Sequence, residues 1–140
     1  MKKVSIVIPM YNEQEVAEKC YEKIIDTLKR IEEKYDYEII FINDGSKDKT
    51  LEILRNIAQK NIKAKIISFS RNFGHQSAVT AGLKKVTGDA VVIIDADLQD
   101  PPELIPEMLN LWEKGNDIIY GKRKLRKGES KFKLLTASMF

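Results

Sequence analysis

Two aspartates, two positions apart, directly follow a short apolar run. Asp95 comes after Val91-Val92-Ile93-Ile94, and Asp97 lies just beyond it. If this run is a buried strand, both carboxylates leave the sheet close together. Carboxylate oxygens suit Mg²⁺ or Mn²⁺, and Mg²⁺ typically takes one or two of them and completes its shell with substrate phosphates. The pair therefore predicts a divalent metal site, with a helix-capping role before Pro101 as the structural alternative.

Residues able to hold a nucleotide follow two earlier apolar runs. The carboxylate of Asp44 can accept a hydrogen bond from the N–H of a base, and Gly45 beside it permits a close backbone approach. Tyr11 offers a ring for stacking against a base, and Glu13 can accept from a hydroxyl or a base donor. An ordinary turn with a helix cap is the structural alternative for residues 43–46.

A third polar group comprises Arg71, Asn72 and His75 and follows a further apolar run. These residues could shape the same pocket. His75 is the only histidine of the chain, and a histidine is a natural candidate for a general base. Packing of the loop is the alternative role for its ring.

The elements that would position these groups alternate along the chain. Apolar runs rich in β-branched or aromatic residues predict five buried strands, at 4–8, 37–42, 64–69, 90–94 and 117–120. Apolar residues at helical spacing predict helices within 16–31, 51–58 and 104–112, and a weaker one at 76–86 that contains Gly82. Ser46 or Asp48 can cap the second helix, and Pro101 and Pro102 suit the first turn of the fourth.

This alternation predicts an α/β fold with a mainly parallel twisted sheet and helices on both faces. The loops after the five strands, including Gly121-Lys122-Arg123, then share one edge of the sheet, where ligands bind in such folds. We therefore expect one common ligand site.

Composition narrows the class of protein. The chain has 140 residues, of which 43% are hydrophobic and 32% charged, as in one ordinary globular domain. Its single cysteine, Cys20, cannot form an internal disulfide and falls in a helical pattern as a small buried hydrophobe. No apolar stretch reaches the roughly 20 residues that a membrane span needs, and we expect no nucleic-acid partner.

Charge is concentrated near the carboxyl terminus. Seven basic residues against Glu129 give the segment from Lys122 to Lys133 a local charge of +6, although the whole chain carries only +3. A compact cationic segment suggests a phosphate-bearing partner or an anionic membrane surface, with a solvated tail as the alternative. Residues 131–140 look like the start of an amphipathic helix. We expect residues 1–121 to form the nucleotide-binding domain and 122–140 a basic, truncated acceptor or membrane-proximal segment.

Four motifs together resemble family 2 glycosyltransferases of the GT-A fold, and among them most closely the polyprenyl-phosphate glycosyltransferases. The motifs are Pro9-x-Tyr11-Asn12-Glu13, Asn43-Asp44-Gly45-Ser46, Arg71-Asn72-x-Gly74 and Asp95-x-Asp97-x-Gln99-Asp100-Pro101-Pro102. The resemblance covers nearly the whole chain. One departure is Asn43, where many relatives have Asp.

The resemblance implies a role for each motif. The nucleoside pocket would be lined by Pro9, Tyr11, Glu13 and Asp44, and Asn12 would also bind the nucleotide sugar. Asp95 and Ala96 would meet the sugar-phosphate region, and Asp95, Asp97 and Gln99 would form the metal site. Arg123 would bind donor or acceptor phosphate, and Asp97 and Arg123 would carry catalysis. Arg123, Arg126 and Lys127 would face an acceptor phosphate or the membrane.

The resemblance also implies an activity: inverting, Mg²⁺- or Mn²⁺-dependent transfer of a sugar from a UDP- or GDP-sugar to a polyprenyl phosphate, at the cytoplasmic face of a membrane. A lipid monophosphate is largely dianionic at pH 7, because its second pKa is about 6, and needs little help from a base. A same-fold enzyme acting on a glycan would instead need a positioned base.

Proteins of two other classes also bind nucleotides or nucleotide sugars. A nicotinamide-dependent dehydrogenase does not fit, because Pro9-Met10-Tyr11-Asn12-Glu13 replaces the Gly-x-Gly-x-x-Gly turn after the first strand. A non-catalytic module that binds a nucleotide sugar is the alternative from another class.

Overall fold

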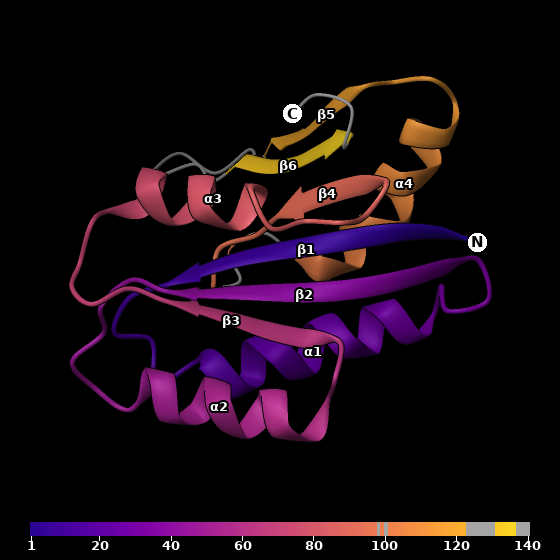
Figure 1. Cartoon of the computed structure of the whole chain (residues 1–140). Helices are drawn as coiled ribbons and strands as arrows, with labels where there is room; N and C mark the ends of the chain where they lie inside the picture. Colours follow the sequence, from indigo (N-terminus) through magenta and orange to yellow (C-terminus); the bar gives the residue numbers. More distant parts are fainter. Residues whose placement is uncertain (98, 100, 123–130, 137–140) are drawn as a thin grey trace.

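One six-stranded sheet forms the centre of the protein. The computed structural model describes residues 1–97, 99, 101–122 and 131–136 (Figure 1). The strand order across the sheet is β3-β2-β1-β4-β6-β5. The strands are β1 (Lys2–Met10), β2 (Tyr35–Asn43), β3 (Ala64–Ser68), β4 (Ala90–Ile93), β5 (Ile118–Lys122) and β6 (Lys131–Thr136).

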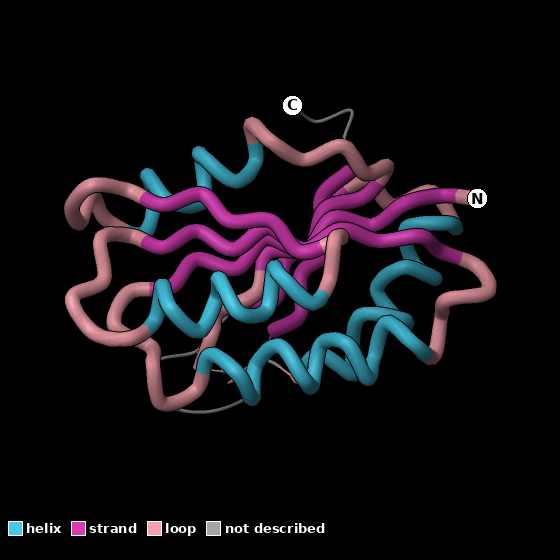
Figure 2. The backbone as a smooth tube through the Cα atoms, turned by 60° about the horizontal axis from the view of Figure 1, so that its bottom comes forward, coloured by secondary structure: helices cyan, strands magenta, loops and turns pink. Residues whose placement is uncertain are grey.

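Helices alternate with the first five strands, as the sequence predicts. They are α1 (Ala17–Lys29), α2 (Thr50–Lys60), α3 (His75–Leu83), the short 3₁₀ helix η1 (Pro102–Leu104) and α4 (Ile105–Glu113). Pro102 opens η1, in the first turn where its missing N–H costs nothing. Figure 2 shows the strands as a twisted layer with helices above and below it.

Most of the sheet is parallel, which confirms the predicted α/β class. β1 pairs in parallel with β2 and β4, and β2 pairs in parallel with β3. β6 is antiparallel to both β4 and β5 and lies between them.

The helix expected over residues 131–140 is wrong for Lys131–Thr136, which is strand β6. The residues of Lys131-Phe132-Lys133-Leu134 alternate between charged and apolar, which is a strand period as well as part of a helical one. The deciding factor is tertiary, because β4 would otherwise leave the backbone groups of one edge unpaired.

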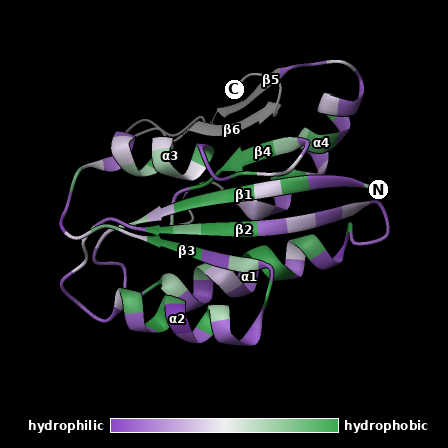
Figure 3. Cartoon of the chain, viewed as in Figure 1, coloured by the Kyte–Doolittle hydropathy of each residue, from purple (hydrophilic) through white to green (hydrophobic). Residues whose placement is uncertain are grey.

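Two apolar layers sandwich the sheet. One packs alternate residues of β1, such as Ile6 and Ile8, against Ile24 of α1, Leu54 of α2 and Leu109 of α4. The other packs the opposite face of the sheet against α3. Figure 3 shows the matching apolar bands on the central strands. Cys20 is buried in the first layer, as predicted, and burial raises the pKa of its thiol to about 12.

Gly82 explains how α3 lies so close to the sheet. A Cβ atom at this position would stand 2.6 Å from Cγ1 of Val7 and 2.8 Å from Cδ1 of Ile42. Gly82 weakens the helical pattern in the sequence, but its lack of a side chain allows the helix to contact β1 and β2.

A buried polar network lies away from the loops that carry the predicted chemistry. The Glu38 carboxylate accepts hydrogen bonds from Ser5 Oγ (2.6 Å), the Thr87 backbone N–H (2.6 Å) and Lys65 Nζ (3.1 Å). Lys3 Nζ lies 3.8 Å away. Burial raises the pKa of Glu38, but these hydrogen bonds and the Lys3 charge outweigh it, so the pKa is lowered overall.

Within the described residues, no helix combines the length and the apolar character needed to cross a membrane.

Candidate active site

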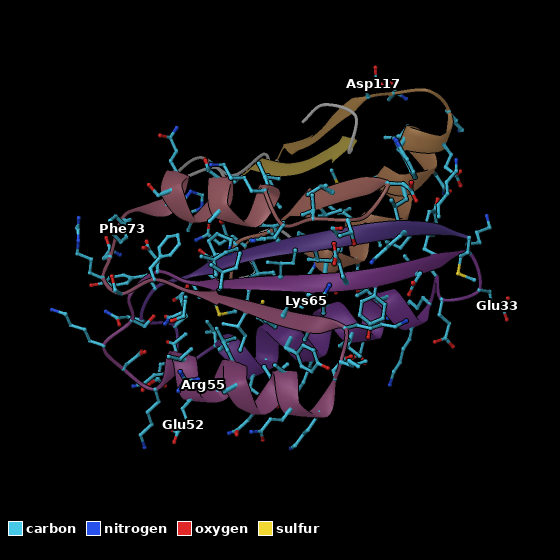
Figure 4. The ribbon with its side chains drawn as sticks, viewed as in Figure 1. Glu33, Glu52, Arg55, Lys65, Phe73 and Asp117 are labelled. Carbon is cyan, nitrogen blue, oxygen red and sulfur yellow. The ribbon has the colours of Figure 1, made fainter. Side chains whose placement is uncertain are left out.

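A pocket of about 440 Å³ opens at the carboxyl edge of the sheet. It unites four of the five loops that the sequence predicts to meet. Figure 4 shows the labelled Phe73, from one of these loops, beyond the arrowheads of β1–β3, with Glu33 at the opposite end. The residues lining the pocket are Pro9, Met10, Tyr11, Glu13, Asp44, Asn72, Gly74, His75, Asp95, Ala96 and Asp97.

The first two loops are joined by hydrogen bonds. The Asn12 backbone N–H donates to Ser46 Oγ (2.9 Å), and the Lys47 N–H donates to Asn12 Oδ1 (2.8 Å). The Glu13 N–H donates to Thr50 Oγ1 (2.8 Å). Asn12 has a positive φ of 51°, a conformation that asparagine adopts more readily than most residues. Asn12 thus fixes the loops and is not among the pocket-lining residues, so its predicted contact with the donor stays a prediction.

Asp48 supports the same junction. Its Oδ1 accepts from the backbone N–H of Thr50, the first residue of α2 (2.9 Å), and its Oδ2 accepts from the Gln14 N–H (3.2 Å). Neither of the two predicted capping residues is the N-cap of α2, which is Lys49 and makes no side-chain capping bond. Asp48 supports the start of the helix through its bond to the Thr50 N–H. Ser46 bonds to Asn12 instead.

Asp44 organises the third loop. Its side chain is almost fully buried and accepts hydrogen bonds from the backbone N–H groups of Phe73 (2.7 Å) and Gly74 (3.1 Å) and from Asn72 Nδ2 (3.1 Å). A carboxylate offers about four lone-pair sites, so few remain for a base. The predicted base contact stays a prediction, and the structure adds a role in loop placement that the sequence did not reveal.

Gly45 allows the close backbone approach that the sequence suggests, but the backbone that approaches it belongs to the third loop of the protein and not to a ligand. With φ at 70°, a Cβ atom there would lie 2.2 Å from the carbonyl carbon of Arg71. Arg71 itself lies with its guanidinium carbon 4.0 Å from the ring centroid of Phe73. Arg71 lines an adjoining cavity of about 400 Å³, which Tyr11 also borders.

Asn43, the departure from the family pattern, has a structural role here. It is buried, its Oδ1 accepts from the Ser46 N–H (3.1 Å), and its Nδ2 donates to Ser68 Oγ (3.0 Å). It is not among the residues lining the main pocket, so the change does not alter that surface directly.

Several carboxyl groups lie close together at the pocket. Burial, followed by repulsion from Asp97, Asp48 and Asp95, raises the pKa of Glu13. His75 Nε2 lies 3.2 Å from Asp95 Oδ1, a contact that no sequence pattern predicts. Carboxyl groups from two different loops, Glu13 and the Asp95–Asp97 pair, therefore line one pocket.

This donor set fits a divalent cation bound together with phosphates. Among the described residues, no group of three or more His, Cys, Asp or Glu side chains forms a metal site complete on its own. Two pocket carboxylates, Asp95 and Asp97, match the number that Mg²⁺ usually takes from a protein. Gln99 donates its backbone N–H to Asp97 Oδ1 (3.2 Å) and is not among the lining residues, so its ligand role stays a prediction.

The predicted acceptor residues Arg123, Arg126 and Lys127 lie outside the described residues. Gly121 and Lys122, expected in the fifth loop, are the last residues of β5. β5 runs in the same direction as β4, because both are antiparallel to β6.

The protein thus has a mainly parallel α/β sheet with two aspartates in a pocket at its carboxyl edge, and known proteins share this arrangement. The model of glycosyl transferase family 2 matches residues 5–138, so the chain belongs to that family. Solved glycosyltransferase structures share its GT-A fold.

Two curated relatives and one solved structure illustrate the likeness. "Uncharacterized glycosyltransferase YkcC" of Bacillus subtilis is 51% identical over 97% of this chain and 42% of that protein. "Bactoprenol glucosyl transferase" of Shigella phage SfX is 43% identical over 99% of this chain and 45% of that protein. A mannosyltransferase of Pyrobaculum calidifontis in complex with GDP-Man and Mn²⁺ is 26% identical, with a TM-score of 0.60 over 69% of this chain and 28% of that one. The chain thus spans less than half the length of these proteins.

Proposed function

We propose that the protein transfers a sugar from a nucleotide diphosphate sugar to a polyprenyl phosphate, with inversion and with Mg²⁺ or Mn²⁺. The observation that carries this proposal is the meeting of Asp95 and Asp97 with the loops of Tyr11 and Asp44 in one pocket. The bound GDP-Man and Mn²⁺ of the mannosyltransferase and the name of the phage relative support the donor, the cofactor and the acceptor.

The donor would lie along the pocket. Pro9, Tyr11, Glu13 and Asp44 would hold the nucleoside, and Asp95 and Ala96 would meet the sugar-phosphate region. Asp97, with Asp95 and Gln99, would hold the cation, which supplies Lewis-acid stabilisation of the charge on the departing diphosphate. The joined loops around Asn12 keep this surface in place before the donor arrives.

The chemical step needs few protein groups. An oxygen of the acceptor phosphate attacks the anomeric carbon as the bond from that carbon to the β-phosphate oxygen breaks, and the nucleotide diphosphate leaves. A dianionic phosphate is already a nucleophile at pH 7, so no general base is required. Attack from the side opposite the leaving group inverts the anomeric configuration.

The acceptor would bind through the basic segment. Arg123 and Arg126 can each hold a phosphate through two N–H groups, and Lys127 adds attraction to an anionic surface. In this proposal residues 1–121 bind the donor, while 122–140 serve the acceptor at the cytoplasmic face of a membrane and also supply β6 to the sheet of the donor-binding half.

A donor panel tests the proposal. UDP-glucose, UDP-GlcNAc, GDP-mannose and GDP-glucose are titrated calorimetrically, each with and without Mn²⁺ or Mg²⁺. We expect one of these donors to bind with an affinity that the cation increases. Absence of cation-assisted binding for every donor would overturn the proposal.

A second assay compares acceptors. The donor that binds is offered to a polyprenyl phosphate and to a sugar acceptor in parallel. Transfer to the lipid phosphate supports the proposed acceptor, and transfer to the sugar supports a glycan-modifying enzyme. Donor binding without transfer to either acceptor supports a non-catalytic module.

A further inference from the structure

His75 is a pocket residue that the proposed reaction does not use. Its Nε2 atom lies 3.2 Å from Oδ1 of Asp95, which comes from a different loop. The His75 side chain is 65% exposed, so burial of the ring does not explain its position. The contact spans 20 residues of sequence and joins the start of α3 to the end of β4.

The backbone fixes the position of His75 from both sides. Gly74, which precedes it, has a φ of 104°, a conformation that side chains rarely allow, and donates its N–H to Asp44 Oδ2 (3.1 Å). Beyond His75, α3 is held against the sheet where Gly82 meets Val7. The ring is therefore presented to Asp95 by a supported loop and a packed helix.

Chemistry determines which of the two side chains donates the hydrogen bond. An ionised carboxylate can only accept hydrogen bonds, so the proton of the contact belongs to Nε2 of His75. A hydrogen bond to Oδ1 fixes the rotation of the Asp95 carboxylate and leaves Oδ2 available to a ligand. Hydrogen bonds of this kind orient carboxylate ligands around metals in proteins.

We propose that His75 is a positioning residue, which holds the Asp95 carboxylate in the orientation that the nucleotide sugar and its cation require. This inference rests on the proposed function of the pocket. It assigns to His75 neither the role of a general base nor that of a metal ligand.

Binding measurements with matched variants test the inference. UDP-glucose and GDP-mannose are titrated with and without Mn²⁺ into the unmodified protein and three variants. His75→Ala should weaken the Mn²⁺-dependent affinity for the bound donor by about tenfold or more, the usual effect of losing a residue that orients a metal ligand. His75→Gln, whose amide can donate from a similar position, should recover part of the loss. Gln76→Ala, an exposed neighbour in the same helical turn, should bind as the unmodified protein does.

The outcomes separate this inference from the proposed function. If the unmodified protein binds neither donor with Mn²⁺, the proposed function fails for these donors. If it binds and His75→Ala binds equally well, only the positioning role is overturned. A His75→Gln variant as weak as His75→Ala, with unchanged thermal stability, would also overturn it.

A spectroscopic test needs no donor. As the only histidine, His75 gives a single set of imidazole resonances. Asp95→Asn should shift the ring ¹⁵N and ¹H signals, because it removes the charged acceptor, whereas Asp97→Asn should leave them nearly unchanged. Equal shifts in both variants would contradict a specific contact with Asp95.

Discussion

The aspartates of the pocket differ in how far their side chains are exposed to solvent. Asp44 is buried, and its oxygens are occupied by three protein donors, whereas Asp97 is exposed at the pocket surface. The Asp44 carboxylate therefore holds the loop and has few lone-pair sites left for a nucleoside, whereas an exposed carboxylate such as Asp97 can offer its oxygens to a cation. The two residues should therefore respond differently to substitution.

Asp97→Asn should reduce the Mn²⁺-dependent affinity for the nucleotide sugar by about tenfold or more, because a charged oxygen ligand is lost. Thermal stability should change little, since the side chain is exposed. Calorimetry with and without Mn²⁺, beside a melting curve, measures both effects. Unchanged cation dependence would remove Asp97 from the metal site.

Asp44→Ala should lower the free energy of unfolding by about 1–3 kcal/mol, because the N–H groups of Phe73 and Gly74 lose their acceptor. Donor binding should weaken more than affinity for the metal alone. Asp44→Asn is the matched control, since it keeps one acceptor oxygen and should lose less stability. Urea unfolding measures the stability of both variants. An Asp44→Ala protein with an unchanged free energy of unfolding would contradict the role of Asp44 in loop placement.

At the scale of elements, helix α3 joins the pocket to the core. Its first residue, His75, faces the pocket, and Gly82 near its end contacts β1 and β2 through their side chains. The distance between this helix and the sheet therefore affects both stability and the site.

Gly82→Ala should destabilise the protein by about 1–3 kcal/mol, because the added methyl group would overlap Val7 and Ile42. At an open helical position the same change would stabilise by roughly 1 kcal/mol. Ser77→Ala, at an exposed position of α3, is the control and should be neutral or slightly stabilising. Thermal unfolding compares the two, and a stabilised Gly82→Ala variant would show that the packing relaxes easily.

The strands could be predicted where the pattern of apolar residues along the chain is enough to identify them. The strands around Ile6, Ile40 and Val92 are fully buried, so their unbroken apolar runs identify them from sequence alone. β6 was not predictable, because Lys131-Phe132-Lys133 suits either period and its assignment depends on the open edge of β4.

The candidate site was predictable as a set of loops but not as a set of contacts. Parallel topology brings the strand ends together, and this placed Asp95 and Asp97 near Tyr11. The bonds from Asp44 to the third loop and from His75 to Asp95 depend on backbone geometry at Gly45 and Gly74, which no residue pattern states.

At the scale of the whole molecule, polar groups are buried away from the pocket as well. The Glu38 network joins β1, β2 and β3 with the turn before β4, because Ser5, Lys65 and Thr87 all donate to one carboxylate. Its loss would loosen the sheet without touching the pocket residues.

The lowered pKa of Glu38 predicts a pH dependence of stability. The ordinary value for Glu is 4.5, so above it the group is ionised in both states and its full stabilisation is present. As the pH falls below 4.5 and through the lower folded-state pKa, the folded carboxylate takes up a proton and this stabilisation is lost. Urea unfolding between pH 3 and 7 measures the effect.

Glu38→Gln tests the same network. It should lower the free energy of unfolding at pH 7 by about 3 kcal/mol, since Lys65 and Lys3 lose a buried partner. It should also flatten the loss of stability below pH 4.5. Glu18→Gln, at an exposed position on α1, is the control. If the Glu38→Gln protein still loses as much stability below pH 4.5 as the unmodified protein, this pH dependence does not come from Glu38.

The position of β6 between β4 and β5 has a consequence for synthesis of the protein. While the chain emerges from a ribosome, β1 to β4 can assemble in the order of their appearance, because each pairs with a strand already made. β5 appears next but must wait, since its neighbour in the sheet is translated after it. The nascent chain therefore pairs β1 to β4, the strands that lead to the pocket loops, first. β5, which leads into the basic segment, joins the sheet last, together with β6.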